Sequence, residues 1–422
     1  MKFLTLSTLY LILLISASCS KGGSRSDDGS QAKIAANAEF FKLVGKVYPY
    51  RTNNSESQKS ILTKCIYITE SNESCTVNEL APLGVSHDYV STEDILSRTL
   101  VSHDFLGAHF EKALNSLQNP YLRKLFGSVT AVVISDKINP SFYTSRTGVI
   151  YISGRYLWLN EAQKKIVTQV TDTRGANLST TNSSKLKFEF TSRAHIKGTN
   201  IRYPVKGLDR NLDDILPNLF RLLVHELTHA NDYLPSSYYR DLSGTEDDRI
   251  GEILFERYKN YKMVSDQITS LTFSEILTNY AKAFYQNLDI SPDLIKMDAY
   301  EMAENFEKSN ACDQYAFHST REDLAMLVEE LISLSEMGIE NSRAIISYPE
   351  NDFMIPNDYQ YPISWGVTNR ILKPDVFKRA MEGSEKIFEN FESFDIALKL
   401  KDIKMIEATP GISLTEFFNH HP

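Results

Sequence analysis

Two histidines four residues apart carry the clearest chemical signal in this chain. They lie in the run Val224-His225-Glu226-Leu227-Thr228-His229, and residues four apart lie on one face of a helix, with about 6 Å between their Cβ atoms. One nitrogen of each imidazole can then bind the same Zn²⁺ at about 2.0–2.1 Å. Glu226 is rotated by about 100° from His225, so its carboxylate would hold a water and not the metal. Zinc lowers the pKa of water toward about 7, and the carboxylate can take the proton as the water attacks a carbonyl.

The residues around this pair predict a buried helix. Apolar side chains surround the motif, at Leu219, Phe220, Leu222, Leu223, Val224 and Leu227. Pro217 suits the first turn of such a helix. Buried imidazoles and a buried carboxylate are costly without a partner, and a metal ion is the natural partner. Core histidines satisfied by other protein groups are the structural alternative.

The segment His225-Glu226-Leu227-Thr228-His229 resembles the motif of the zincin metallopeptidases. Residues 230–235 do not continue as the Gly-x-x-His of the metzincin branch. In the gluzincin branch the third ligand is a Glu on a later helix, and the resemblance implies the same arrangement here.

Glu322 is the third ligand that we favour. Ser319 or Thr320 can cap a helix whose first turn carries Glu322, and the apolar residues that follow bury that helix. The segment is similar to the third-ligand helix of the anthrax-lethal-factor-like zincins, in which a Tyr seven residues before the Glu lies near the scissile carbonyl. This resemblance implies that Tyr315 stabilises the developing oxyanion by donating a hydrogen bond.

Other acidic residues remain alternatives for the third ligand. Glu246, Asp248 and Glu252 lie nearer to the motif. Their alternative role is to start a helix, because negative charge there is favoured by the helix dipole.

Asn231 and Asp232 could orient an imidazole or cap the end of the helix. His318 could donate to an oxyanion or have only a structural role.

The first residues predict export. A positive charge at Lys2, a short apolar run over 4–15 and small residues before Cys19 form a signal peptide too short to span a bilayer. A Cys after small residues resembles a bacterial lipobox. This implies a lipoprotein signal peptide at 1–18 and lipid attachment at Cys19, while a plain secretory signal that contains a Cys is the alternative.

A flexible tether is expected at 19–35, because residues 20–30 include no apolar side chain that could pack. An acylated Cys anchors a protein to a membrane without a transmembrane helix. The resemblance to lipoproteins implies a place in the cell envelope, with Ser20 favouring the outer membrane.

The other cysteines fit an exported protein. Cys65 and Cys75 flank a polar turn-like segment and could close a short hairpin with a disulfide, although two free thiols are the alternative. Cys312 is left over in a helix-prone region, which favours a buried free thiol.

Composition and hydrophobic periodicity predict a folded α+β protein. The 422 residues include 45 Lys+Arg and 54 Asp+Glu, a net charge of -9 that argues against nucleic-acid binding. We expect a small N-terminal segment at 36–84 and a metallopeptidase-like domain at 85–422, mostly helical with a small sheet. The β-branched runs at 129–134 and 148–152 predict strands, the second of which could be an edge strand for a peptide substrate.

Residues 171–204 predict loops with an irregular hairpin. The chain from 211 to 340 is expected to be mainly helical, because apolar residues recur there at spacings of three and four. The expected helices are 217–231, 247–262, 272–287, 293–308 and 320–336. Later in the chain we expect a turn region at 364–367 and a helix at 374–398.

These features together predict an exported, lipid-anchored metallohydrolase, with one Zn²⁺ per chain bound by His225, His229 and Glu322. Glu226 would be the general base and Tyr315 the oxyanion donor of a peptidase acting on an unidentified peptide or protein. A zinc hydrolase of cell-wall amide bonds uses the same residues. A non-catalytic envelope lipoprotein with a structural or vestigial zinc site is the alternative from a different class.

Overall fold

The computed structural model describes residues 37–51, 54–86, 89–171, 186–196, 209–242, 247–286, 288–348 and 360–420. The expected signal peptide, the tether with Cys19, and the alternative ligand Glu246 lie outside these residues. Among the helices of the described residues, none has the length and apolar character needed to cross a bilayer.

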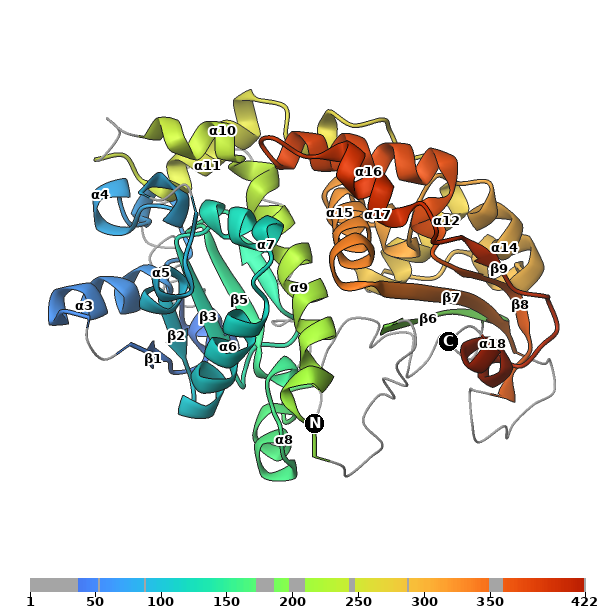
Figure 1. Cartoon of the computed structure of the whole chain (residues 1–422), viewed down its shortest axis with the longest axis horizontal. Coiled ribbons are helices and arrows are strands. Elements are labelled where there is room, and N and C mark those ends of the chain that lie inside the picture. Colours follow the sequence, from blue (N-terminus) through green and yellow to red (C-terminus); the bar gives the residue numbers. More distant parts are fainter. Residues whose placement is uncertain are drawn as a thin grey trace. The chain divides into compact units, whose positions relative to one another are not determined.

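The chain folds into two compact units, each with its own sheet (Figure 1). Unit 1 contains residues 1–171, 208–212 and 233–261, and unit 2 contains residues 172–207, 213–232 and 262–422. Helices predominate over strands in the described residues, so the expected α+β class is confirmed.

Unit 1 is built on a five-stranded sheet of order β1-β2-β3-β5-β4. Its central strands are parallel and its two edge strands antiparallel. The strands are β1 (Tyr48–Pro49), β2 (Thr99–Val101), β3 (Ala131–Ser135), β4 (Phe142–Thr144) and β5 (Val149–Ser153). Every residue of β3 and β5 is buried, as expected for parallel strands covered on both faces.

The helices of unit 1 lie around this sheet, and α6 packs against β2 and β3 (Figure 1). They are α3 (Glu56–Cys65), α4 (Val77–Leu80), α5 (Thr92–Ser97), α6 (Asp104–Ser116), α7 (Pro120–Leu125), α8 (Glu161–Val167), α10 (Ser236–Tyr239) and α11 (Ile250–Asn260). The strands expected at 129–134 and 148–152 are present as β3 and β5. The expectation that the second is an edge strand is wrong, because β5 pairs with both β3 and β4.

The disulfide expected between Cys65 and Cys75 is present, with 5.6 Å between the Cα atoms. It joins the end of α3 to the residue before Thr76, the N-cap of α4, and therefore does not close a hairpin. Residues 36–84 share their sheet and hydrophobic core with later residues, because β1 pairs with β2 and Leu62 packs in the same cluster as Val133. The expected boundary at residue 84 therefore does not separate two cores.

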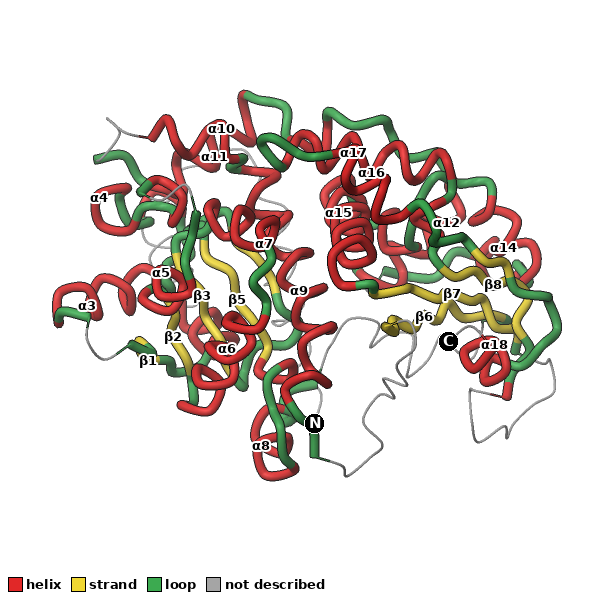
Figure 2. The backbone as a smooth tube through the Cα atoms, viewed as in Figure 1, coloured by secondary structure: helices red, strands yellow, loops and turns green. Residues whose placement is uncertain are grey.

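Unit 2 is built on a four-stranded antiparallel sheet of order β6-β7-β8-β9. The strands are β6 (Phe188–Ile196), β7 (Ile339–Ser347), β8 (Ile363–Thr368) and β9 (Ile406–Glu407). Successive residues of β7 face opposite sides of the sheet. Ile345 therefore joins the core formed with α12 and α14, while Ala344 and Ile346 join the core formed with α18. Figure 2 shows α12 and α14 on one side of this sheet and α18 on the other.

Eight helices contribute described residues to unit 2. They are α9 (Leu212–Tyr233, of which 213–232 belong to this unit), α12 (Glu275–Tyr285), α13 (Pro292–Lys296), α14 (Ala299–Glu307), α15 (Thr320–Met337), α16 (Pro374–Ile387), α17 (Ser393–Leu400) and α18 (Leu414–His420). The helices expected at 217–231, 272–287 and 320–336 correspond to α9, α12 and α15.

Some expected elements differ from those observed. The helix expected at 293–308 is two helices, because Asp298 forms a capping box with Glu301 and starts α14 anew. The helix expected at 374–398 is likewise divided into α16 and α17. The hairpin expected within 171–204 is wrong for the described part, because β6 pairs with β7.

Pro217 lies within α9 and not in its first turn, because the helix begins at Leu212. Proline lacks the N–H that would bond to the carbonyl four residues earlier, and its ring crowds that carbonyl. Here that carbonyl belongs to Asp213, next to the start of the helix, so one bond is lost and the helix continues toward the two histidines.

Candidate metal centre

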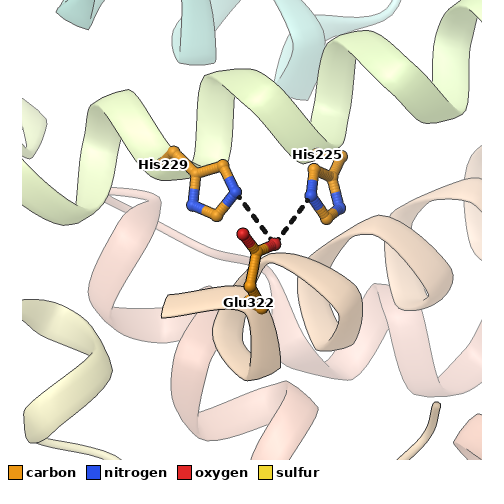
Figure 3. A group of neighbouring side chains, drawn as sticks. All are labelled: His225, His229 and Glu322. Atoms are coloured by element: carbon orange, nitrogen blue, oxygen red, sulfur yellow. Dashed lines mark hydrogen bonds and ion pairs between the residues drawn. The ribbon is translucent and has the colours of Figure 1, made fainter. Parts of the chain in front are cut away.

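His225, His229 and Glu322 converge on one point within unit 2 (Figure 3). The two histidines lie on one face of α9, with ring centroids 4.9 Å apart, and Glu322 reaches them from α15. The Nε2 atoms of both histidines lie 3.2 Å from the same carboxylate oxygen, Oε2 of Glu322. One possible ligand atom from each residue lies within 4.8 Å of the others. The three residues could therefore hold a metal ion.

Two of the separations among these atoms are close to those expected around a small tetrahedral ion. An ion about 2.0–2.1 Å from each ligand in tetrahedral geometry separates its ligand atoms by about 3.3–3.4 Å. Both nitrogen–oxygen distances are 3.2 Å in the structure, where these atoms also hydrogen-bond to one another. Two imidazoles and one carboxylate form a donor set typical of catalytic zinc sites.

The local sequence explains how Glu322 comes to lie here. Ser319 is the N-cap of α15, and its hydroxyl accepts a hydrogen bond from the backbone N–H of Glu322 at 3.2 Å. Glu322 is thereby held in the first turn, ahead of the apolar residues that bury the helix. The side chains of His225, His229 and Glu322 keep 13%, 14% and 15% of their surface exposed, so the cluster lies close to solvent.

Glu329 fixes the orientation of the His225 ring, a role that we did not expect from the sequence. Its Oε2 lies 3.1 Å from Nδ1 of His225, and its Oε1 lies 2.7 Å from Arg221. A carboxylate on the second ring nitrogen is the usual partner of a metal-binding histidine, because it leaves Nε2 available for the metal. Arg221 is one turn before His225, and Glu329 is two turns after Glu322. This helical spacing was the sequence signal from which the role of Glu329 could have been predicted.

The charges of the cluster shift its pKa values in opposite directions. Burial lowers the pKa of His225, but hydrogen bonds to Glu322 and Glu329 outweigh it and raise the pKa well above its ordinary value. Burial raises the pKa of Glu322, but the charge of His229 and the hydrogen bonds from both histidines hold it well below its usual range. Without a metal, the cluster therefore holds a proton. A bound metal would displace this proton, because the atoms that bind a metal must be deprotonated.

Asp232 anchors the end of α9. Its carboxylate accepts hydrogen bonds from the backbone N–H of Ser265 at 2.8 Å and from the Ser265 hydroxyl at 2.9 Å. Burial raises the pKa of Asp232, although these hydrogen bonds oppose the shift. Asn231 donates to the carbonyl of Leu227 at 2.8 Å. Asp232 therefore ties α9 to residues 264–266, close to the helical turn that carries His229.

The two residues expected to act in catalysis lie in α9 and beside it. Glu226 is buried, with 7% of its surface exposed, and directly follows His225. The ring of Tyr315 stacks on that of His225, with centroids 6.3 Å apart and planes at 16°. Asp313 caps the short helix 314–317 and accepts a hydrogen bond from the backbone N–H of Tyr315. The catalytic roles of Glu226 and Tyr315 remain predictions.

The alternative third ligands do not belong to this cluster in the described residues. Asp248 and Glu252 lie in unit 1, where the carbonyl of Asp248 accepts a hydrogen bond from Val77 and Glu252 occupies the first turn of α11. Cys312 is buried and free, as expected. Burial raises its pKa well above the ordinary value, which keeps the thiol protonated.

Comparisons with known protein families, with curated proteins and with solved structures found no match to this chain.

If the site binds a metal ion, replacing Glu329 by Gln is expected to weaken the binding of added zinc by about 10–100-fold, because the ring of His225 loses its charged partner. A competition titration against a chromogenic chelator measures this change. Glu336→Gln is the matched control, since it changes the residue two further turns along α15, which pairs with Lys399 and not with a histidine. Equal affinities for wild type and Glu329→Gln would show that Glu329 does not support the metal ligand.

Proposed function

We propose that this protein is an exported, lipid-anchored zinc hydrolase, and first of all a peptidase. The observation that carries the proposal is the convergence of two imidazole nitrogens on one oxygen of Glu322. Catalytic zinc sites use three protein ligands, whereas structural zinc sites usually use four. Within the part of the chain that the structure describes, the cluster that could hold a metal has three members.

In this proposal a bound zinc ion would act as a Lewis acid and lower the pKa of a water molecule. Glu226 would be the general base, because it directly follows a metal ligand and its carboxylate can accept a proton from that water. Tyr315 would donate its phenolic hydrogen to the developing oxyanion from its place beside His225. Glu329 would hold the His225 ring, and Arg221 would hold Glu329.

Export is supported by two features. Residues 1–18 resemble a lipoprotein signal peptide and are followed by Cys19. The disulfide between Cys65 and Cys75 belongs to an oxidising compartment such as the periplasm. The lipid anchor at Cys19 and the outer-membrane location are part of the proposal.

Glu226→Gln tests the proposed chemistry. We expect it to retain one zinc per chain, because Glu226 is not a ligand, and to lose about 10²–10⁴-fold in hydrolysis rate, because the general base is gone. The assay uses a quenched-fluorescence library of peptides, with metal content measured by plasma mass spectrometry on the same samples. Glu256→Gln on α11, an exposed carboxylate in unit 1, is the control.

Two results would contradict the proposal. Hydrolysis by Glu226→Gln at the wild-type rate would exclude Glu226 as the base. A wild-type chain that holds one zinc but cleaves neither the peptide library nor muropeptide fragments of the cell wall would favour a non-catalytic envelope lipoprotein.

A further inference from the structure

Three ring side chains form a group beside the metal ligands. Tyr285 is the last residue of α12, whereas Tyr315 and His318 belong to the short helix 314–317 and its C-cap. The ring centroids lie 4.4 Å apart for Tyr285 and Tyr315, 5.5 Å for Tyr315 and His318, and 6.1 Å for Tyr285 and His318. Tyr315 also stacks on His225. We call Tyr285, Tyr315 and His318 the aromatic triad.

The triad continues an aromatic core but is itself more exposed. Tyr280, one turn before Phe284 on α12, is 2% exposed, and its ring stacks on that of Phe284 at 5.7 Å. The Phe284 ring contacts that of Tyr285 at 4.9 Å. All three members of the triad are only half-buried. The rings therefore pass from the core toward solvent at the place where the metal ligands are also partly exposed.

The rings of Tyr315 and His318 are stacked, with planes at 30°, and the ring of Tyr285 is inclined to both. The planes of Tyr285 and Tyr315 meet at 56°, and those of Tyr285 and His318 at 85°. Tilted and edge-to-face arrangements are those that aromatic rings prefer. A further ring placed against the exposed part of the triad can pack in one of these preferred arrangements, which an aliphatic side chain cannot do.

Tyr315, the central member of the triad, is held in place before any substrate binds. Asp313 accepts a hydrogen bond from the backbone N–H of Tyr315, and Arg343 donates to Asp313 from the buried sheet at 2.9 Å. A preorganised surface loses little entropy when a ligand binds.

We infer that the aromatic triad is a substrate subsite next to the metal ligands, and that it takes an aromatic side chain of the peptide to be cleaved. The inference rests on the proposed zinc hydrolase function and adds a substrate class to it. Tyr285, supplied by a helix separate from α9 and α15, is the residue that determines this preference. An aromatic pair contributes about 0.5–1.5 kcal/mol beyond its buried area, so contacts with several rings correspond to about a tenfold preference.

Binding of three small hydroxamates tests the inference without an activity assay. The probes are acetohydroxamate, phenylacetohydroxamate and cyclohexylacetohydroxamate, which share a metal-binding group and differ in the side chain. Calorimetry on the zinc-loaded mature chain gives the dissociation constant of each. We expect the phenyl probe to bind about tenfold more tightly than the methyl probe, and more tightly than the cyclohexyl probe.

Variants of Tyr285 show whether the tighter binding of the phenyl probe depends on this side chain. Tyr285→Leu should reduce the advantage of the phenyl probe to less than about threefold, whereas Tyr285→Phe should keep it, because the ring is retained. Tyr300→Leu, an exposed ring on α14, is the control and should change nothing. Zinc content and near-ultraviolet circular dichroism, measured on each variant, show that the chain is folded and loaded.

The outcomes distinguish a failure of the proposed subsite from a failure of the proposed zinc hydrolase function. If zinc loads and acetohydroxamate binds, but the phenyl group adds nothing or Tyr285→Leu keeps the full gain, the subsite is wrong and the metal centre stands. Equal binding of the phenyl and cyclohexyl probes would indicate a general apolar surface and would overturn the aromatic class. A chain that does not load zinc would overturn the proposed function, and the subsite with it.

Discussion

Glu322→Ala is expected to abolish stable zinc binding. The carboxylate supplies the one oxygen on which both imidazoles converge, at 3.2 Å from each Nε2. Loss of a supporting residue outside the ligand set costs about 10–100-fold in metal affinity, and loss of a ligand should cost more. His225→Ala should have the same effect, because it removes another member of the same set. Metal content after gel filtration, on wild type and variants side by side, measures the result.

Thermal unfolding provides an independent measure of the same change. A ligand present at about 1,000 times its dissociation constant stabilises the native state by about 4.1 kcal/mol, so zinc should raise the melting temperature of the wild type. Glu322→Ala should remove this shift, and Glu322→Gln should reduce it, because an uncharged amide oxygen is a weaker ligand than a carboxylate. The melting temperature without zinc is the reference for each variant.

The alternative ligands supply the matched controls. Asp248→Ala and Glu252→Ala change acidic residues near α11 in unit 1, and both should keep one zinc per chain. If Glu322→Ala retained zinc while either of these lost it, the third ligand would be in unit 1 and our assignment would be wrong.

The sequence allowed us to predict the centre of the site, because its signals are local. His225 and His229 are four residues apart in a helix, and the cap at Ser319 with an apolar run after Glu322 marks the start of another. Local spacing of this kind is sufficient to place a side chain on a helix face. Glu329 was missed because no local feature distinguishes it: it lies inside α15, away from the cap at Ser319, and only its spacing of two turns after Glu322 could have indicated it.

The sheet of unit 2 was missed for a different physical reason. Strand β7 is buried along nearly its whole length, yet it begins with the polar run Glu340-Asn341-Ser342-Arg343, which has no period-two alternation. These side chains are tolerated because each meets a partner, as Ser342 meets Thr368 at 2.7 Å. Such partners lie far away in the sequence, so hydrophobic pattern could not indicate a buried strand.

Strand β8 was taken for a turn because it contains Ser364-Trp365-Gly366-Val367. The glycine is needed for close packing and not for a turn. A Cβ atom on Gly366 would lie 2.9 Å from Ile363 and 3.0 Å from Ala408. This requirement arises from the approach of another segment, which a single sequence does not display.

Arg343→Met is expected to destabilise unit 2 by about 3–5 kcal/mol, because it leaves buried carboxylates without their cation. The Arg343 side chain is 2% exposed and lies 2.6 Å from Asp313, and it also bonds to Glu330. It therefore ties the segment that carries Tyr315 to α15, the helix that carries Glu322.

The loss of stability caused by Arg343→Met should depend on pH. Burial raises the pKa of Glu330 to about 7, and the charges of Asp313 and Glu329 add to this, while Arg343 opposes it. Without Arg343 the folded-state pKa of Glu330 should rise further above its unfolded value. A native state that holds more protons than the unfolded state loses stability as pH rises. The deficit of Arg343→Met should therefore be larger at pH 8 than at pH 5.

Urea unfolding followed by the fluorescence of Trp365 measures this loss within unit 2. The chain has 2 tryptophans, so a Trp158→Phe background leaves Trp365 as the only reporter. Lys308→Met is the control, because Lys308 forms an exposed pair with Glu304 and should contribute less than about 1 kcal/mol. Arg343→Met/Glu330→Gln should recover part of the loss, since it removes one uncompensated charge.

A loss from Arg343→Met as small as that of the control would show that the buried carboxylates do not depend on Arg343. The link between the Tyr315 segment and α15 would then have to come from apolar packing alone.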